Sequence, residues 1–165
     1  MLRNKNLIPL SHQHPHALAL CVRVERAGPI AQKDLAAWRA EFLQLVDGEI
    51  RIHFAAEEET VFPAASKFPD IVPLVEELIA DHTNLRQQFA RATAQDSTSA
   101  EISALGRDLA AHIRKEERQL FEGMQQRMTA EDLSILGAKL EEALKQSEQS
   151  CILQTEATRL RPIKN

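Results

Sequence analysis

Two His-x-x-x-Glu pairs constrain this chain more than any other feature: His53 with Glu57, and His112 with Glu116. Each pair lies in a segment whose apolar residues recur with the period of an α-helix. Residues four apart on a helix project from the same face, about one turn apart. Each pair therefore offers an imidazole and a carboxylate to a common point, and two pairs on different helices can enclose two metal ions.

Helix-forming residues dominate the sequence, which has only 5 Gly and no Tyr among 165 residues. This composition favours an all-α fold. We expect Ser11 to cap the first helix, Gly28 to end it, and Pro63 to end the second. The apolar periodicity predicts helices over residues 11–27, 34–61, 71–93 and 98–128, and a shorter one from 129 to about 146.

Four amphipathic helices with short connections predict an up-down-up-down four-helix bundle in residues 1–128. The additional short C-terminal helix and a tail occupy residues 129–165. The leucines of this C-terminal helix recur at heptad-like spacing. We therefore expect the helix to pack outside the bundle or against another subunit in a homo-oligomer. These leucines are Leu133, Leu136, Leu140 and Leu144.

The bulk properties exclude several classes of protein. The net charge of −4 is mild and the basic residues are scattered, so we expect no nucleic-acid partner. No stretch approaches the roughly 18 continuous apolar residues of a membrane span, so we expect no membrane association. Cys21 and Cys151 are far apart without a Cys-x-x-Cys pattern, which indicates reduced thiols. We therefore expect a soluble, cytoplasmic protein.

His53, His82 and His112 each lie on the apolar stripe of a different predicted helix. A single histidine on a helix is more often a hydrogen-bonded or surface residue than a metal ligand. Burying Glu57 and Glu116 without partners would cost several kcal/mol, so the alternative to metal requires buried salt bridges. The combined pattern favours metal.

The first helix offers three histidines, His12, His14 and His16. The face of His14 continues through apolar residues, whereas His12 and His16 lead to a mixed surface with arginines. We therefore prefer His14 as the metal ligand. His12 and His16, four residues apart, are expected to be solvated or to form an adventitious surface site.

The order of these residues resembles the hemerythrin-like, or HHE cation-binding, family. The segments PLSHQHPHALAL, IHFAAEEETVFP, ELIADHTNLRQQF and HIRKEERQLF carry the resemblance over about residues 8–128. It implies a four-helix bundle around a non-haem centre of two iron ions. Its terminal ligands would be His14, His53, His82 and His112, and its bridging carboxylates Glu57 and Glu116.

Two departures from the oxygen-carrying hemerythrins bear on function. Those proteins have a second histidine in the third helix, where this chain has Leu78. Their last motif is His-x-x-x-x-Asp, whereas the last motif of this chain is His-x-x-x-Glu and ends at Glu116. Fewer histidines favour sensing, redox chemistry or iron handling over reversible oxygen carriage. The leading interpretation is a centre that binds oxygen, nitric oxide or peroxide in a sensing, scavenging or redox role. Such chemistry implies a reductant, which the sequence does not identify.

The sequence is also compatible with two other functions. One is iron handling, including iron–sulfur cluster repair, and the other is a helical interaction module that uses the leucines of the last helix. The ligand types also accept manganese or zinc.

Four further glutamates lie near the predicted ligands. Glu49, one turn before His53, could fix an imidazole tautomer, cap a polar end of the core or reach solvent. We expect Glu58, Glu59 and Glu117 to be solvated, with Glu58 or Glu117 as substitute ligands if the helix register differs by one residue.

Overall fold

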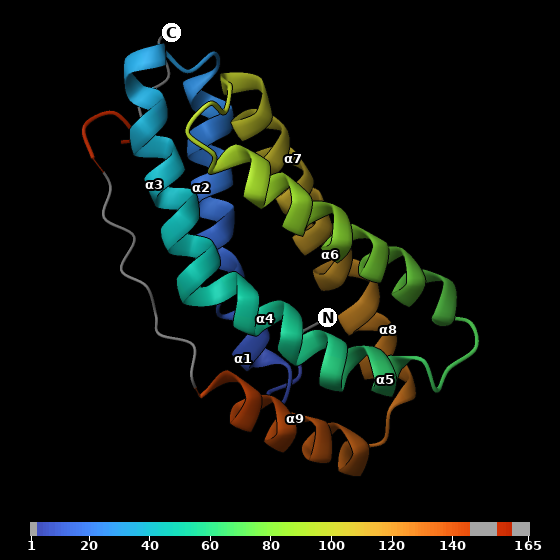
Figure 1. Cartoon of the computed structure of the whole chain (residues 1–165). Helices are drawn as coiled ribbons and strands as arrows, with labels where there is room; N and C mark the ends of the chain where they lie inside the picture. Colours follow the sequence, from blue (N-terminus) through green and yellow to red (C-terminus); the bar gives the residue numbers. More distant parts are fainter. Residues whose placement is uncertain (1–2, 146–154, 160–165) are drawn as a thin grey trace, which may run out of the picture.

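The computed structural model describes residues 3–145 and 155–159, and no residue in these two ranges forms a β-strand. Four helical arms run alternately up and down, and α9 crosses one end of them (Figure 1). The all-α prediction is confirmed. Within the described ranges, no helix combines the length and the apolar character needed to cross a bilayer. Most of the predicted C-terminal tail lies outside the described residues.

The first arm consists of α1 (Ile8–Ser11) and α2 (His14–Ala27). The main helix starts at His14 and not at Ser11, which instead ends α1 and makes no capping hydrogen bond. Gly28 ends α2 as predicted, because its φ of 64° lies in the left-handed region that glycine adopts without a steric penalty.

The second arm is a nearly continuous helix with two π-helical turns. In chain order it comprises a 3₁₀ turn Gln32–Asp34, α3 (Leu35–Leu45), the π turn Val46–Ile50, α4 (Arg51–Ala56), the π turn Glu57–Val61 and α5 (Phe62–Ala65). The prediction that Pro63 ends this arm is wrong. Pro63 lies in the first turn of α5, directly after a π turn whose wider hydrogen-bonding pattern accommodates its missing N–H.

The third arm is α6 (Val72–Ala92). The fourth begins with α7 (Ser99–Lys115) and continues through the π turn Glu116–Leu120 into α8 (Phe121–Arg127). The predicted capping box is present: the Thr98 side chain accepts a hydrogen bond from the Glu101 backbone, and the Glu101 side chain accepts one from Thr98.

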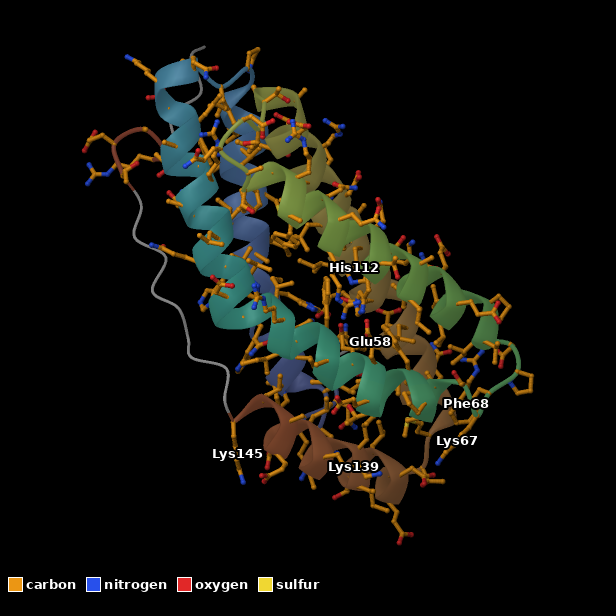
Figure 2. The ribbon with its side chains drawn as sticks, viewed as in Figure 1. Glu58, Lys67, Phe68, His112, Lys139 and Lys145 are labelled. Atoms are coloured by element: carbon orange, nitrogen blue, oxygen red, sulfur yellow. The ribbon has the colours of Figure 1, made fainter. Side chains whose placement is uncertain are left out.

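The C-terminal helix α9 (Ala130–Leu144) starts at Thr129, whose side chain accepts a hydrogen bond from the Asp132 backbone. It packs against α1, α4 and the π turn Glu57–Val61 of the same chain. Its leucine stripe is buried there, whereas Lys139 and Lys145 lie on its exposed face (Figure 2). The apolar face of this helix is therefore used within the chain.

The apolar core has two parts, separated along the bundle axis by a buried polar layer. The Trp38 cluster fills one half, and its members include Trp38, Phe42, Phe54, Phe89 and Leu105. The Phe121 cluster fills the half near α9, and its members include Phe62, Leu78, Phe121, Met124 and Leu136. The polar layer between them contains the predicted site.

Candidate metal centre

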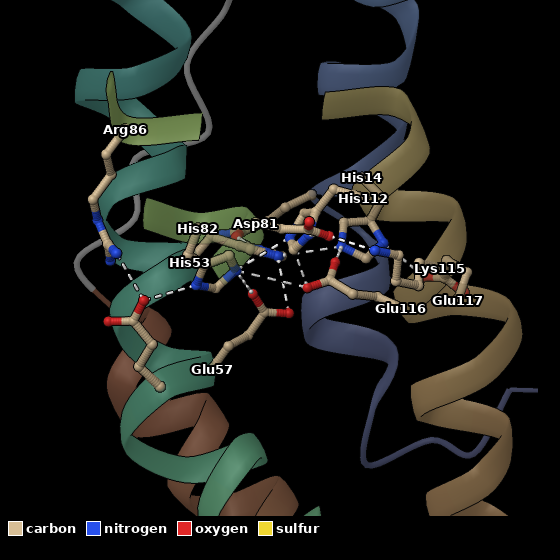
Figure 3. Close-up of polar contacts among 12 residues, drawn as sticks. His14, His53, Glu57, Asp81, His82, Arg86, His112, Lys115, Glu116 and Glu117 are labelled. Carbon is tan, nitrogen blue, oxygen red and sulfur yellow. Dashed lines mark hydrogen bonds and ion pairs between the residues drawn. The ribbon is translucent and has the colours of Figure 1, made fainter. Parts of the chain in front are cut away.

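Six polar side chains from all four arms converge between the two apolar clusters (Figure 3), and we refer to them as the His–Glu layer. None of them is more than 4% exposed. The layer consists of His14, His53, Glu57, His82, His112 and Glu116. The structure thus brings together every residue of the predicted ligand set.

Helix geometry places the two carboxylates of this layer. Glu57 and Glu116 each follow a histidine by one turn, and each is the first residue of a π-helical turn. The Phe62 N–H donates to the Glu57 carbonyl, and the Phe121 N–H donates to the Glu116 carbonyl, both five residues back. Such widened turns are frequent at functional sites.

The histidines meet in two pairs. The Nε2 atoms of His14 and His53 are 3.2 Å apart, and those of His82 and His112 are 3.1 Å apart. In the neutral imidazoles each Nε2 carries a lone pair, because Nδ1 is the nitrogen that donates its proton to a neighbouring oxygen. Two lone pairs facing each other at this distance repel, so each pair requires a positive charge between its members.

Each carboxylate divides its two oxygens between the two histidine pairs. Glu57 Oε1 is 3.3 Å from His53 Nε2, and its Oε2 is 3.4 Å from His82 Nε2. Glu116 Oε2 is 3.4 Å from His14 Nε2, and its Oε1 is 2.9 Å from His112 Nε2. Two groups of four possible ligands therefore share both glutamates, which fits two cations bridged by carboxylates.

The electrostatics of the layer also favour added positive charge. Burial alone would lower the pKa of His14, but the carboxylates of Glu116 and Glu117 raise it to about 9. The pKa of His82 is likewise raised to about 9, since Glu116 and Glu57 outweigh the effect of burial. Burial would raise the pKa of Glu116, yet the histidines around it, His112 first, hold it well below its ordinary value. Without metal, protons supply the missing charge.

Every histidine of the layer has an oxygen partner on its outer nitrogen, Nδ1. The pairs are His14 with Glu117 at 2.7 Å, His53 with Gln13 at 2.8 Å, His82 with Glu58 at 2.8 Å and His112 with Asp81 at 3.4 Å. A carboxylate or amide oxygen can only accept, so each Nδ1 donates and each Nε2 is turned inward, where it could bind a metal ion. Metal-binding histidines characteristically have such partners.

Cations hold three of these outer partners in place, and an aromatic ring packs against one histidine of the layer. Arg3 pairs with Glu117, Arg86 Nη1 lies 2.8 Å from Glu58 Oε1, and Lys115 Nζ donates to Asp81 Oδ2 at 2.7 Å. The Phe54 ring stacks on His82 with centroids 3.8 Å apart and an interplanar angle of 13°. The imidazole orientations are therefore fixed before any ion binds.

A small cavity of about 10 Å³ lies over the layer on the side of the Trp38 cluster. Polar atoms of His14, His53, His112 and Glu116 line its floor, and apolar side chains such as Phe54 line its walls. This volume holds about one water-sized molecule.

The remaining histidines lie outside the layer. His12 and His16 are exposed, whereas His14 is buried in the layer. Glu49 is buried and accepts a hydrogen bond from His16 Nδ1 at 3.1 Å. The partner that fixes the His53 tautomer is instead Gln13.

The sequence interpretation missed the partners of the outer nitrogens. Glu58 and Glu117 were expected to be solvated, but they bind His82 and His14. The sequence did contain one signal for them. Glu58 directly follows Glu57, and Glu117 directly follows Glu116, so both His-x-x-x-Glu pairs are followed by a second glutamate. Gln13 and Asp81 carry no comparable signal, because each precedes a layer histidine yet binds a histidine of another arm.

Comparison with known proteins agrees with this geometry. The family model of the hemerythrin HHE cation binding domain matches residues 9–124. Comparisons with curated proteins and with solved structures gave no significant match. The family match covers more than half of the 165 residues and includes the whole His–Glu layer, and the chain therefore belongs to the hemerythrin HHE cation-binding domain family.

Proposed function

We propose that the His–Glu layer holds two iron ions and that this centre binds or reacts with oxygen, nitric oxide or peroxide in a sensing, scavenging or redox role. The observation that carries this proposal is the division of each carboxylate between two histidine pairs. Among the described residues, no hydrogen bond satisfies the carboxylate oxygens of Glu57 and Glu116, although both side chains are fully buried. Bridging two cations satisfies all four oxygens.

Iron suits this set of ligands. Imidazole and carboxylate bind ferrous iron well, and four imidazoles with two shared carboxylates leave coordination positions open. The bound iron would supply those open positions and the electrons for reduction of the incoming molecule. The chain itself contributes fixed ligand atoms, oriented by the partners of Nδ1, and a cavity of limited size.

The size of the inner cavity limits what can reach the centre. Its volume of about 10 Å³ fits a diatomic gas or a peroxide only with small side-chain adjustments and excludes organic substrates. Its walls are mostly apolar, which favours neutral molecules such as oxygen and nitric oxide. This supports a small-molecule ligand.

The alternatives find less support. An interaction module based on α9 would need an exposed leucine stripe, but Leu133, Leu136 and Leu140 are at most 4% exposed within the chain. Iron donation would favour accessible ligands, whereas the ligand set is buried.

The proposal is tested by purifying the protein without oxygen and measuring iron per chain, followed by absorption spectra as oxygen, nitric oxide or hydrogen peroxide is admitted. We expect about two irons per chain and new near-ultraviolet and visible bands with at least one of these molecules. Absence of iron, or one zinc without a spectral response, would contradict the proposal.

A further inference from the structure

Two cavities beside the His–Glu layer share part of their lining. The inner cavity, over the layer, has a volume of about 10 Å³. The outer one, between the N-terminal segment and α9, has a volume of about 500 Å³ and is open to the surface. Gln13 and Glu49 line both cavities, and we call this shared boundary the Gln13–Glu49 wall.

The two residues of the wall are held from opposite sides. The Gln13 Oε1 atom accepts a hydrogen bond from His53 Nδ1, on the side of the layer. The Glu49 Oε1 atom accepts one from His16 Nδ1, and the His16 side chain is 46% exposed in the outer cavity. Glu49 is thus anchored by a residue in contact with solvent, whereas Gln13 is anchored by a residue of the layer.

Irregular helix geometry places both side chains in the wall. Gln13 lies at the break between α1 and α2, and Glu49 lies in the π turn Val46–Ile50. Glu49 is 2% exposed, so water screens the charge of its carboxylate poorly. A carboxylate in this position acts strongly on charged molecules that pass it.

We propose that the Gln13–Glu49 wall is the entrance for small molecules to the His–Glu layer, and that the Glu49 carboxylate makes this entrance selective for neutral molecules over small anions. A buried carboxylate repels an approaching anion strongly, because the low local dielectric constant screens the interaction poorly. Oxygen, nitric oxide and hydrogen peroxide are neutral and pass without this barrier. This inference rests on the proposed function, since it assumes that the small molecule binds over the layer.

The test compares association rates of an anion and a neutral ligand in three variants. Azide binding is followed in cobalt(II)-substituted protein, and nitric oxide binding in the anaerobic ferrous protein, both by stopped-flow absorbance. Glu49→Gln removes the charge and nearly preserves shape, so we expect the azide rate to rise about tenfold or more while the nitric oxide rate changes less than about twofold. Glu49→Ala also opens the wall, so both rates should rise.

Glu141→Gln is the matched control, because exposed Glu141 lines only the outer cavity. We expect it to change the azide rate less than about twofold, since solvent screens an exposed charge. Metal content and melting temperature of each variant establish that the layer is intact. If all variants hold two metals per chain and Glu49→Gln leaves the azide rate unchanged, the entrance proposal alone is wrong. If the parent protein binds no metal, the proposed function and this inference both fail.

Discussion

Beside Trp38 the bundle buries Arg23 with Glu41, whereas the His–Glu layer buries two carboxylates that face only histidines among the described residues. Arg23 Nη2 is 2.5 Å from Glu41 Oε2, and Arg23 Nη1 donates to the Thr158 carbonyl at 2.9 Å. The two side chains are 6% and 1% exposed. This pair supplies its own opposite charge.

The layer contains no permanently charged cation of its own. Its carboxylates share the space with four imidazoles, of which two have pKa values raised to about 9 because the site attracts cations. Both regions carry the desolvation cost of buried ionisable groups, but the Arg23–Glu41 pair offsets it with a permanently charged guanidinium, whereas the layer depends on protonated histidines or added cations. A buried polar cluster whose charges balance only when an ion or proton is added indicates a functional site, whereas one whose own residues balance their charges indicates a structural role.

The largest expected effect comes from removing a residue of the layer. His53→Ala or Glu57→Ala should abolish metal binding and lower the melting temperature of the purified protein, because bound metal adds about 4 kcal/mol at a free concentration 1,000-fold above Kd. His12→Ala should change neither, since His12 is exposed outside the layer. Metal analysis and thermal unfolding check this. Equal metal content in all three variants would refute the ligand assignment.

The second prediction reverses the comparison by breaking the ion pair. Arg23→Met leaves the Glu41 charge buried without its partner and should reduce the free energy of unfolding by about 3–5 kcal/mol. The metal content of Arg23→Met should stay at the parent value. The double variant Arg23→Met, Glu41→Leu should recover much of the lost free energy of unfolding. Urea unfolding of metal-free protein measures the change. Loss of metal in Arg23→Met would show that the two regions are not independent.

A smaller effect is expected one step away from the layer. Glu58→Gln weakens the acceptor of the His82 Nδ1 hydrogen bond and should lower metal affinity about 10–100-fold. The neighbouring Glu59→Gln is the control, because Glu59 is exposed. Competition with a metal chelator measures both affinities. If the two variants released metal alike, the outer carboxylates would have no orienting role.

The smallest effect concerns the half of the bundle that the Trp38 cluster fills. Burial raises the pKa of the Cys21 thiol to about 12, so the thiolate is scarce until the pH approaches that value. In a Cys151→Ser background, iodoacetamide at pH 8 should leave Cys21 unmodified in the native state, with or without metal, and should modify it after unfolding. Mass spectrometry detects the adduct. Rapid native modification would show that the Trp38 cluster opens.

The helices and the convergence of the layer could be predicted from sequence because both depend on local spacing. The i, i+4 relation of His53 and Glu57 fixes their common face, and the apolar neighbours of His14 distinguish it from His12. Two of the Nδ1 partners, Gln13 and Asp81, could not be predicted, because each reaches a histidine of another arm only through the relative position of the two arms. The continuation of the second arm through Pro63 depends on a π turn that no sequence period indicates.

The central claim is that the layer holds two cations bridged by two carboxylates, and anomalous diffraction from iron-loaded crystals tests it most directly. The account predicts two anomalous peaks per chain, one among His14, His53 and the two glutamates, the other among His82, His112 and the same glutamates. A single peak in the layer, or peaks only beside exposed His12 and His16, would contradict it.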